Sequence, residues 1–210
     1  MARAAASHAE GRVSAVARLK IVLKDVEPLV MRRVDVPLSI RLDRLHTVIQ
    51  TAMGWSDTHL WEFRFAGEVV FGIPDPDYRS DMLDARKETL RGVLEDSGGK
   101  TFHYVYDFGD YWHHVIKVER VTAALPDFDY PFFLTGTGRC PPEDIGGVPG
   151  YAEYLAALAD PDYPDRDDYL RYRSEDFDPD KLDTVAIALA IEDLSRQWAP
   201  KPRRKAPAKS

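Results

Sequence analysis

Apolar and polar residues alternate along the first patterned part of the chain. In residues 19–24, leucine and isoleucine occupy every second position and lysines stand at two of the positions between them, which predicts a strand with one buried face. Residues 25–28 include an aspartate and a proline and are expected to form a turn. Residues 29–36 again mix valines with charged residues, so the two runs are expected to pair as a hairpin.

The period changes to that of a helix after the hairpin. Residues 41–53 carry apolar side chains at positions i, i+3, i+7 and i+11, from Leu42 to Met53, which form one continuous stripe. Gly54 stands where a left-handed residue commonly ends a helix. A hairpin followed by a helix and a strand is the order that opens a β-grasp arrangement, although a fold alone does not carry a function.

Short strands and turns follow, and the chain ends in helices. Strands are predicted at residues 59–65 and 69–71 and in a hairpin at residues 102–118, and helices at residues 89–94, 150–159, 165–173 and 183–197. Residues 123–139 are expected to be irregular. The predicted fold class is α+β, with a mixed or antiparallel sheet, a β-grasp-like opening and a helical C-terminal cap. One domain is expected over residues 17–197, with disordered ends at residues 1–16 and 198–210.

The predicted central hairpin determines which polar side chains can meet. One possible loop is the two residues Gly109 and Asp110. In that register Asp107 pairs with Trp112 and shares a face of the sheet with His114. A three-residue loop would shift the alternation by one position and separate the two side chains, so both registers stay open at this point.

The composition is ordinary for a globular chain, with 210 residues of which 44% are hydrophobic and 30% charged. No apolar run approaches the roughly 20 residues needed to cross a bilayer, so no membrane association is expected. The N-terminus lacks the apolar segment of a secretory signal. A single cysteine, Cys140, excludes an internal disulfide, which favours a reducing, cytoplasmic location.

Charge is unevenly distributed along the chain. The formal net charge is −7, but residues 197–210 contain five basic residues and no acid, which leaves about −12 on the rest. An acidic body repels phosphate, so nucleic acid is expected to bind only weakly, through the basic tail. The favoured alternative is that this tail is a disordered, solubilising end.

Two dense polar stretches, residues 106–114 and 140–151, carry the candidate chemistry. The first places carboxylates, imidazoles and aromatic rings around a turn, and the second contains glycines that permit close approach of the backbone. Together with the start of the strand at residue 59 they define a candidate surface for binding a protein or a small molecule. Its residues are His59, Trp61, Asp107, Asp110, Trp112, His114, Glu143, Asp144 and Tyr151.

A metal or acid–base site is the sharpest hypothesis for this surface. Imidazole and carboxylate ligands suit zinc, manganese or iron, so a divalent metal such as zinc is the candidate cofactor, with His59, Asp107 and His114 as candidate ligands. The structural alternative makes Asp107 and Asp110 turn residues and His114 a half-buried strand residue. Cys140 is either a nucleophile or, as we favour, a buried structural thiol.

Several short blocks of residues follow one another in a specific order. They are Leu45-His46, Ile49-Gln50, Ala52-Met53-Gly54-Trp55, His59-Leu60, Glu62-Phe63, Tyr106-Asp107-Phe108-Gly109-Asp110 with Trp112 and His114, and Cys140-Pro141-Pro142-Glu143-Asp144 with Gly146-Gly147 and Gly150-Tyr151. Over residues 17–195 the chain thereby resembles the plasmid pRiA4b ORF-3-like family. Some members of that family are passengers of insertion elements and carry a resolvase-like label, so the resemblance implies a fold and a link to mobile elements.

The chain departs from the family pattern at two positions. Many members have a second histidine where Trp61 stands and a second cysteine where Ile145 stands, and a metal site built on those ligands would be weakened here. The arginines do not surround a nucleophile, as recombination would require. The leading hypothesis is therefore a cytoplasmic, non-catalytic binding or accessory protein. The alternative is a metal-assisted hydrolase with a His/Asp site, so the sequence leaves open whether the protein is an enzyme.

Overall fold

The computed structural model describes residues 14–74, 81–170 and 176–199. Its strands are β1 (Ala15–Leu23), β2 (Met31–Pro37), β3 (Trp61–Arg64), β4 (Val70–Gly72), β5 (Leu83–Asp84), β6 (Thr101–Tyr106), β7 (Trp112–Ala123) and β8 (Phe132–Thr137). Its helices are α1 (Leu42–Met53), the short 3-10 helix η1 (Ala66–Glu68), α2 (Leu90–Ser97), α3 (Gly147–Ala159), α4 (Arg166–Leu170) and α5 (Thr184–Trp198). This content confirms the predicted α+β class with a helical C-terminal part.

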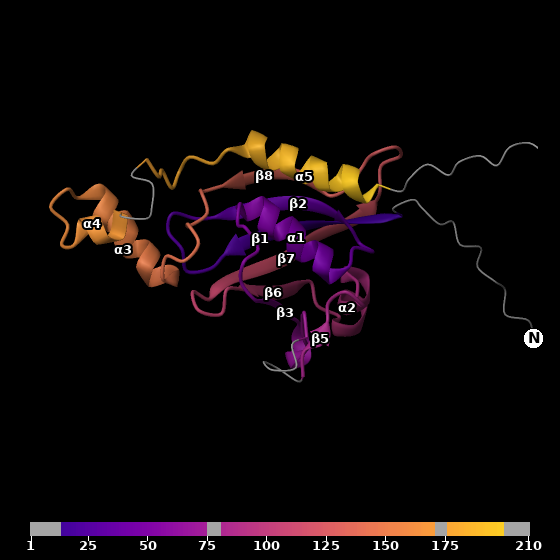
Figure 1. Ribbon diagram of the computed structural model, residues 1–210. Helices are drawn as coiled ribbons and strands as arrows, with labels where there is room; N and C mark the ends of the chain where they lie inside the picture. Colours follow the sequence, from indigo (N-terminus) through magenta and orange to yellow (C-terminus); the bar gives the residue numbers. More distant parts are fainter. Residues whose placement is uncertain (1–13, 75–80, 171–175, 200–210) are drawn as a thin grey trace, which may run out of the picture.

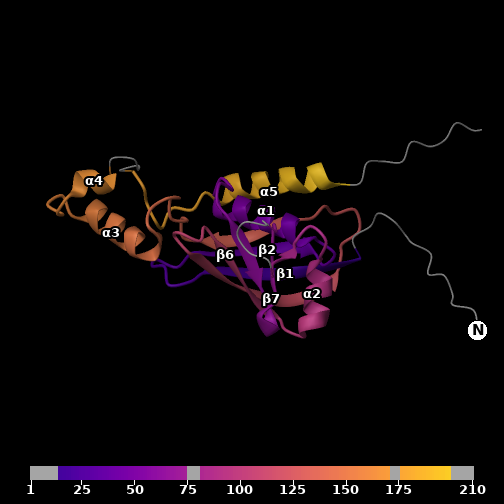
Figure 2. The same ribbon diagram turned by 60° about the horizontal axis from the view of Figure 1, so that its bottom comes forward.

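The described strands form one eight-stranded sheet in the order β5-β4-β3-β6-β7-β1-β2-β8. Only the β4–β5 pair is parallel, so the sheet is mixed. Helix α1 crosses the sheet and α5 runs near β8, on the same side (Figures 1 and 2). Helices α3 and α4 stand beyond one end of the sheet (Figure 1).

The chain opens with the predicted hairpin and helix. Strands β1 and β2 pair antiparallel, and α1 buries the apolar stripe that contains Leu42, Leu45 and Ile49. Gly54 ends α1 with φ 88°, the left-handed conformation predicted for it. Strand β3 does not lie beside β1, because β6 and β7 separate them. The β-grasp-like order therefore describes the sequence of the first elements but not their neighbours in the sheet.

The hairpin of β6 and β7 closes through the loop of residues 107–111. Tyr106 lies directly opposite Trp112, so Asp107 is the first loop residue and is not the partner of Trp112. Its backbone has φ 57°, a conformation that aspartate tolerates better than most residues. The two-residue loop considered from the sequence is wrong, and Asp107 does not share a strand face with His114.

Residues 123–139, expected to be irregular, contain β8. This strand pairs antiparallel with the free edge of β2, with a register shift between Arg33 and Val34. A proline precedes the strand, a glycine lies within it, and the shift breaks the alternation of apolar positions. Because these features interrupt the hydrophobic period, the pattern does not indicate the strand, and the expectation was wrong here.

The ends of the predicted domain can be compared only in part. Strand β1 begins at Ala15, two residues before the expected start, and α5 continues to Trp198. The N-terminal residues 1–13 and the basic tail at residues 200–210 lie outside the described residues. Within the described part, no helix is long and apolar enough to cross a membrane.

The hydrophobic core lies between the sheet and the helices. Inward-facing residues of β1, β6 and β7 are almost completely buried, and so are three of the four tryptophans, Trp55, Trp61 and Trp112. The tryptophans pack in aromatic contacts, such as the stacking of Trp55 on Tyr106 with ring centroids 5.1 Å apart. This packing brings the core directly beneath one group of loops at the end of the sheet.

Candidate functional site

Three loops meet at the end of the sheet where β6 turns into β7. They are the segment between α1 and β3, the turn of residues 107–111, and the loop that precedes α3. The carboxylate of Asp110 accepts hydrogen bonds from the backbone N–H groups of Ile145 and Gly146, at 3.1 and 3.2 Å. The indole N–H of Trp55 donates to the carbonyl of Pro141 at 3.0 Å. These contacts tie the three loops together, so Asp110 serves as a structural connector.

Two glycines allow the backbones to approach this closely. A Cβ on Gly147 would lie 2.3 Å from the carbonyl oxygen of Asp110, and one on Gly150 would lie 1.9 Å from that of Ile145. Both distances are far shorter than a carbon–oxygen contact permits. Gly147 also has φ 67°, which favours glycine. The geometry of the loop that carries Glu143 and Asp144 therefore depends on these two positions.

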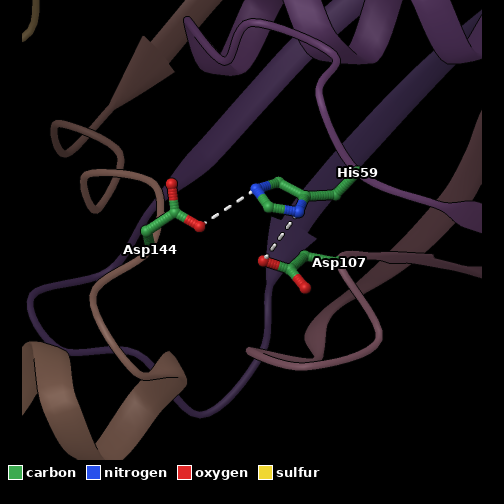
Figure 3. Close-up of side chains that lie close together, drawn as sticks. All are labelled: His59, Asp107 and Asp144. Carbon is green, nitrogen blue, oxygen red and sulfur yellow. Dashed lines mark ion pairs between the residues drawn. The ribbon is translucent and has the colours of Figure 1, made fainter.

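His59 lies between two carboxylates that come from the other two loops. Its Nδ1 is 3.6 Å from Oδ2 of Asp107, and its Nε2 is 3.1 Å from Oδ1 of Asp144 (Figure 3). One ligand atom from each of these three residues lies within 4.8 Å of the other two. Nε2 of His59 is buried, and the Asp144 contact does not align as a hydrogen bond. A buried imidazole nitrogen thus faces a carboxylate oxygen without a proper hydrogen bond.

Asp107 is held firmly in this arrangement. Its Oδ1 accepts hydrogen bonds from the backbone N–H groups of Gly109 at 2.9 Å and Asp110 at 3.3 Å, which leaves Oδ2 directed at His59. Asp144 shares its left-handed backbone, with φ 56°, but its side chain is 75% exposed. The site therefore has one fixed, largely buried carboxylate and one that is open to solvent.

Glu143 lies beside this group but is committed to hydrogen bonds of its own. Its two carboxylate oxygens accept from the hydroxyl and backbone N–H of Ser56 and from the hydroxyl of Tyr106. Burial raises the pKa of Glu143, but the hydrogen bonds from Ser56 and Tyr106 outweigh it and hold the pKa below its usual value. Glu143 is therefore an anion that fixes the first loop to the third.

The remaining predicted site residues lie below the surface. Trp61 stacks on His46 with ring centroids 4.0 Å apart, while Trp112, His114 and Tyr151 are at most 1% exposed. Nδ1 of His114 lies 3.2 Å from the backbone carbonyl of Tyr104. The structure thus brings His59, Asp107 and Asp144 together, and it places His114 in the core, outside that group.

Cys140 also lies inside the protein. Burial raises the pKa of its thiol to about 12, a change that neighbouring Arg32 only partly opposes. The thiol is therefore protonated at neutral pH, as a structural cysteine would be. A nucleophilic role would require the thiolate, which this environment disfavours.

One buried network was not among the predicted site residues. The ring nitrogens of His46 lie 2.7 Å from the hydroxyl of Tyr104 and 2.7 Å from a carboxylate oxygen of Asp57, and the amide of Gln50 donates to the same hydroxyl. His46 and Gln50 occupy the buried side of α1. The sequence signal for this network was the presence of two polar residues among the apolar ones on the buried face of α1. The network anchors α1 to β6 and to the segment that carries His59.

Buried neutral histidines predict a pH-dependent stability. Burial lowers the pKa of His46 to about 4 and that of His114 to about 3, whereas an exposed histidine titrates near 6.5. Above pH 6.5 both rings are neutral in the folded and in the unfolded chain, so their protonation does not change the stability. Below pH 6.5 the rings of the unfolded chain bind protons, while the buried rings of the folded chain stay neutral. The free energy of unfolding should then fall by roughly 1.4 kcal/mol per pH unit for each ring. Urea denaturation between pH 7 and 5 measures this slope.

The variant His114→Gln provides the comparison for that measurement. It removes the ring with the larger lowering of the pKa, so the slope should become clearly shallower than that of the native chain. A free energy of unfolding that is constant from pH 7 to pH 5 in the native chain would contradict the prediction. His113, whose pKa burial also lowers, contributes to the slope of both proteins.

A pocket of about 700 Å³ adjoins the His59 group through Asp144. It lies between the end of α1, the loop before α3, and the segment that leads to α5. Its lining combines carboxylate, guanidinium, aromatic and aliphatic groups: Met53, Gly54, Trp55, Arg139, Cys140, Pro141, Pro142, Glu143, Asp144, Tyr154, Phe177 and Leu182. The guanidinium of Arg139 lies 4.6 Å from the ring centre of Phe177. A small ligand in this pocket would lie next to Asp144.

The fold and the site define an α+β protein with a loop-borne histidine–carboxylate group at one end of its sheet. The sequence profile of the family described as plasmid pRiA4b ORF-3-like protein matches residues 15–186. The chain belongs to this family, as its residue blocks led us to expect.

Two relatives agree with this assignment. The chain is 47% identical over 194 residues to "Uncharacterized protein y4hQ" of Sinorhizobium fredii, and the match covers 92% of this chain and 99% of that protein. The crystal structure of "Protein of Unknown Function MM3350" from Methanosarcina mazei Go1 is 30% identical, with a TM-score of 0.73. That match covers 82% of this chain and 97% of the other. Neither name states an activity, so the function has to be inferred from the site.

Proposed function

We propose that this protein binds a divalent cation between His59 and Asp144, with Asp107 orienting the imidazole, and uses it to hold a ligand. The observation that carries the proposal is the buried Nε2 of His59, which faces Oδ1 of Asp144 at 3.1 Å without an aligned hydrogen bond. Two ligands of one ion lie about this far apart when each is about 2.1 Å from the metal. The nearby carboxylate of Asp107 supports the same assignment.

The donor set indicates which ions are suitable. Imidazole and carboxylate ligands suit zinc, manganese or iron, and they do not resemble the thiolate sets of structural zinc sites. If Nε2 of His59 binds the ion, Asp107 faces Nδ1, the arrangement in which a carboxylate orients a metal-binding histidine. His59 and Asp144 are then the two protein ligands, and a ligand or water would fill the remaining coordination positions.

The location of the group favours a binding role. Asp144 belongs both to this group and to the lining of the neighbouring pocket, so a ligand there could complete the coordination of the ion. We assign the protein to the cytoplasm on the basis of its lone, reduced cysteine. The family resemblance supports the proposal of a link to mobile elements, with an accessory role in such an element as the context.

Metal binding tests the proposal directly. Isothermal titration of metal-stripped protein with Zn²⁺ and Mn²⁺ should give about one site per chain for at least one ion. His59→Ala and Asp144→Asn should each weaken binding at least tenfold, because each removes a ligand. The matched controls His103→Ala and Asp162→Asn remove the same groups elsewhere and should bind normally. Equal affinities in all five proteins would refute the proposal.

A metal-assisted hydrolase is the second candidate at the same site. The exposure of Asp144, at 75%, favours it, because an ion held there would be accessible to water and to a substrate. Metal-loaded protein should then hydrolyse an activated ester or phosphodiester, and His59→Ala should abolish the activity. Metal binding without hydrolysis would leave the binding role as the function.

A further inference from the structure

The second face of the sheet is not covered by α1 and α5, which pack on the opposite side (Figure 2). Along β1, β2 and the first part of β7, buried residues alternate with residues that are half-buried or exposed. The side chains at these outward positions, and at the positions of β3 and β6 that the strand registers align with them, define what we call the outer face. This face is distinct from the cation site and shares none of its three residues.

The outer face carries more cations than anions. The basic residues at its strand positions are Arg18, Lys20, Arg33, Arg64, Lys117 and Arg120, and the acidic ones are Asp35, Glu62 and Glu119. Each of the three acids forms an ion pair with one of the arginines. Among the described residues, no carboxylate pairs with Lys20, Lys117 or Arg120. A local positive charge therefore exists on a chain whose net charge is −7.

The register of the strands places these cations next to one another. Lys20 of β1 lies directly opposite Arg33 of β2 on one side and Lys117 of β7 on the other. Arg18 likewise lies opposite Arg120. Neighbouring strands are about 4.8 Å apart, and like charges in directly opposed positions destabilise a sheet. Arg33 is compensated by its ion pair with Glu119, but Lys20 and Lys117 lie side by side without a carboxylate, and an anionic partner would offset their repulsion.

Flat side chains lie further along the sheet, towards the turn between β6 and β7. His103 and His113 lie with ring nitrogens 2.9 Å apart, and Tyr111 is 44% exposed with its ring 6.2 Å from that of His113. The guanidinium of Arg64 lies 5.6 Å from the ring centre of Tyr111. Burial, together with the nearby His103, Lys24 and Arg64, lowers the pKa of His113. Arg64 pairs with Glu62 and also donates a hydrogen bond of 2.7 Å to the hydroxyl of Tyr111. The exposed ring of Tyr111 is thus held in place beside the outer face.

We propose that the outer face binds single-stranded nucleic acid, with phosphates on the row of Arg33, Lys20 and Lys117 and a base against Tyr111. Cations that follow the backbone together with rings that stack on bases are the two requirements of single-strand binding. An acidic protein would match the charge but would make no use of the exposed ring of Tyr111, on which a base can stack. The net negative charge argued against such binding from the sequence, because it averages over charges that the fold separates.

Fluorescence anisotropy with a labelled 20-nucleotide oligo(dU) tests this proposal on the full chain. Binding should be measurable at 50 mM salt and should weaken steeply by 200 mM, because phosphate contacts release counterions. The double variant Lys20→Glu, Lys117→Glu should weaken binding at least tenfold. The matched control Lys87→Glu, Lys181→Glu changes the net charge equally on other surfaces and should weaken it much less. Tyr111→Ala should weaken binding about fivefold or more through lost stacking.

Two further measurements separate binding at the outer face from binding by the basic tail and from loss of the fold. The same comparisons are repeated with glutamine at Lys201, Arg203, Arg204, Lys205 and Lys209, so that the basic tail does not contribute. Circular dichroism confirms that each variant is folded. The proposal is overturned if the native chain does not bind at 50 mM salt, if both double variants bind alike, or if poly-glutamate displaces the oligonucleotide as well as unlabelled oligo(dU) does.

Discussion

Replacing Arg32 with methionine is expected to destabilise the protein by about 3 to 5 kcal/mol. The guanidinium is completely buried and donates hydrogen bonds of 2.8 to 2.9 Å to four backbone carbonyls, including those of Ala52, Thr137 and Gly138. Methionine fills much of the volume but cannot donate, so several buried carbonyls would lose their partner at roughly 1 kcal/mol or more each. Urea denaturation monitored by circular dichroism measures the change.

The neighbouring residue provides the control. Arg33→Met removes an arginine from the same strand, but its ion pair with Glu119 is partly exposed, so the cost should stay below about 1 kcal/mol. Arg32 joins β2 to the end of α1 and to the end of β8, whereas Arg33 holds only one surface carboxylate. Similar losses for the two variants would show that the buried hydrogen bonds are not the main contribution of Arg32.

Gly150→Ala is the second change with a large expected effect. The new Cβ would lie 1.9 Å from the carbonyl oxygen of Ile145, so the loop before α3 would have to move. We expect a loss of roughly 2 to 4 kcal/mol in the free energy of unfolding. We also expect weaker cation binding, because Asp144 belongs to the displaced loop. Denaturation and metal titration of the same protein measure both effects.

Gly99→Ala is the matched control for this substitution. Its Cβ would approach other atoms no closer than 3.7 Å, an ordinary contact, and the site lies in the turn before β6. Stability should change by less than about 1 kcal/mol, and cation binding should be unaffected. If Gly150→Ala leaves both stability and cation affinity unchanged, the tight approach of the two loop segments is not required for the site.

Hydrophobic period predicted the elements that are amphipathic within a short stretch. The β1–β2 hairpin and α1 follow from alternation and from one apolar stripe, and Gly54 marks the end of α1 as expected. Strand β8 was not predicted, because a glycine interrupts its apolar positions and its pairing with β2 is shifted. The length of the loop at residues 107–111 was not predicted, because Asp107 adopts a left-handed conformation that a periodic pattern does not indicate.

The candidate site was likewise predicted in its residues but not in its contacts. Its residue types were visible in the two dense stretches, and His59, Asp107 and Asp144 were all among the candidates. Which of them meet depends on the contacts of Asp110 with Ile145, and such contacts join loops far apart in the sequence. Whether Asp107 shares a strand face with His114 depends on the length of one loop. The sequence thus indicated which residues could form a site, and tertiary packing determined which of their side chains lie together.

The placement of the tryptophans gives the protein its own optical probe. Trp55, Trp61 and Trp112 lie together under the loops of the site, and Trp55 stacks on Tyr106, whose hydroxyl binds Glu143. The fourth, Trp198, packs against Arg44 at the end of α5. Emission from the buried indoles should therefore respond to the site, and selective removal of Trp198 leaves a chain whose tryptophan emission comes from these three residues alone.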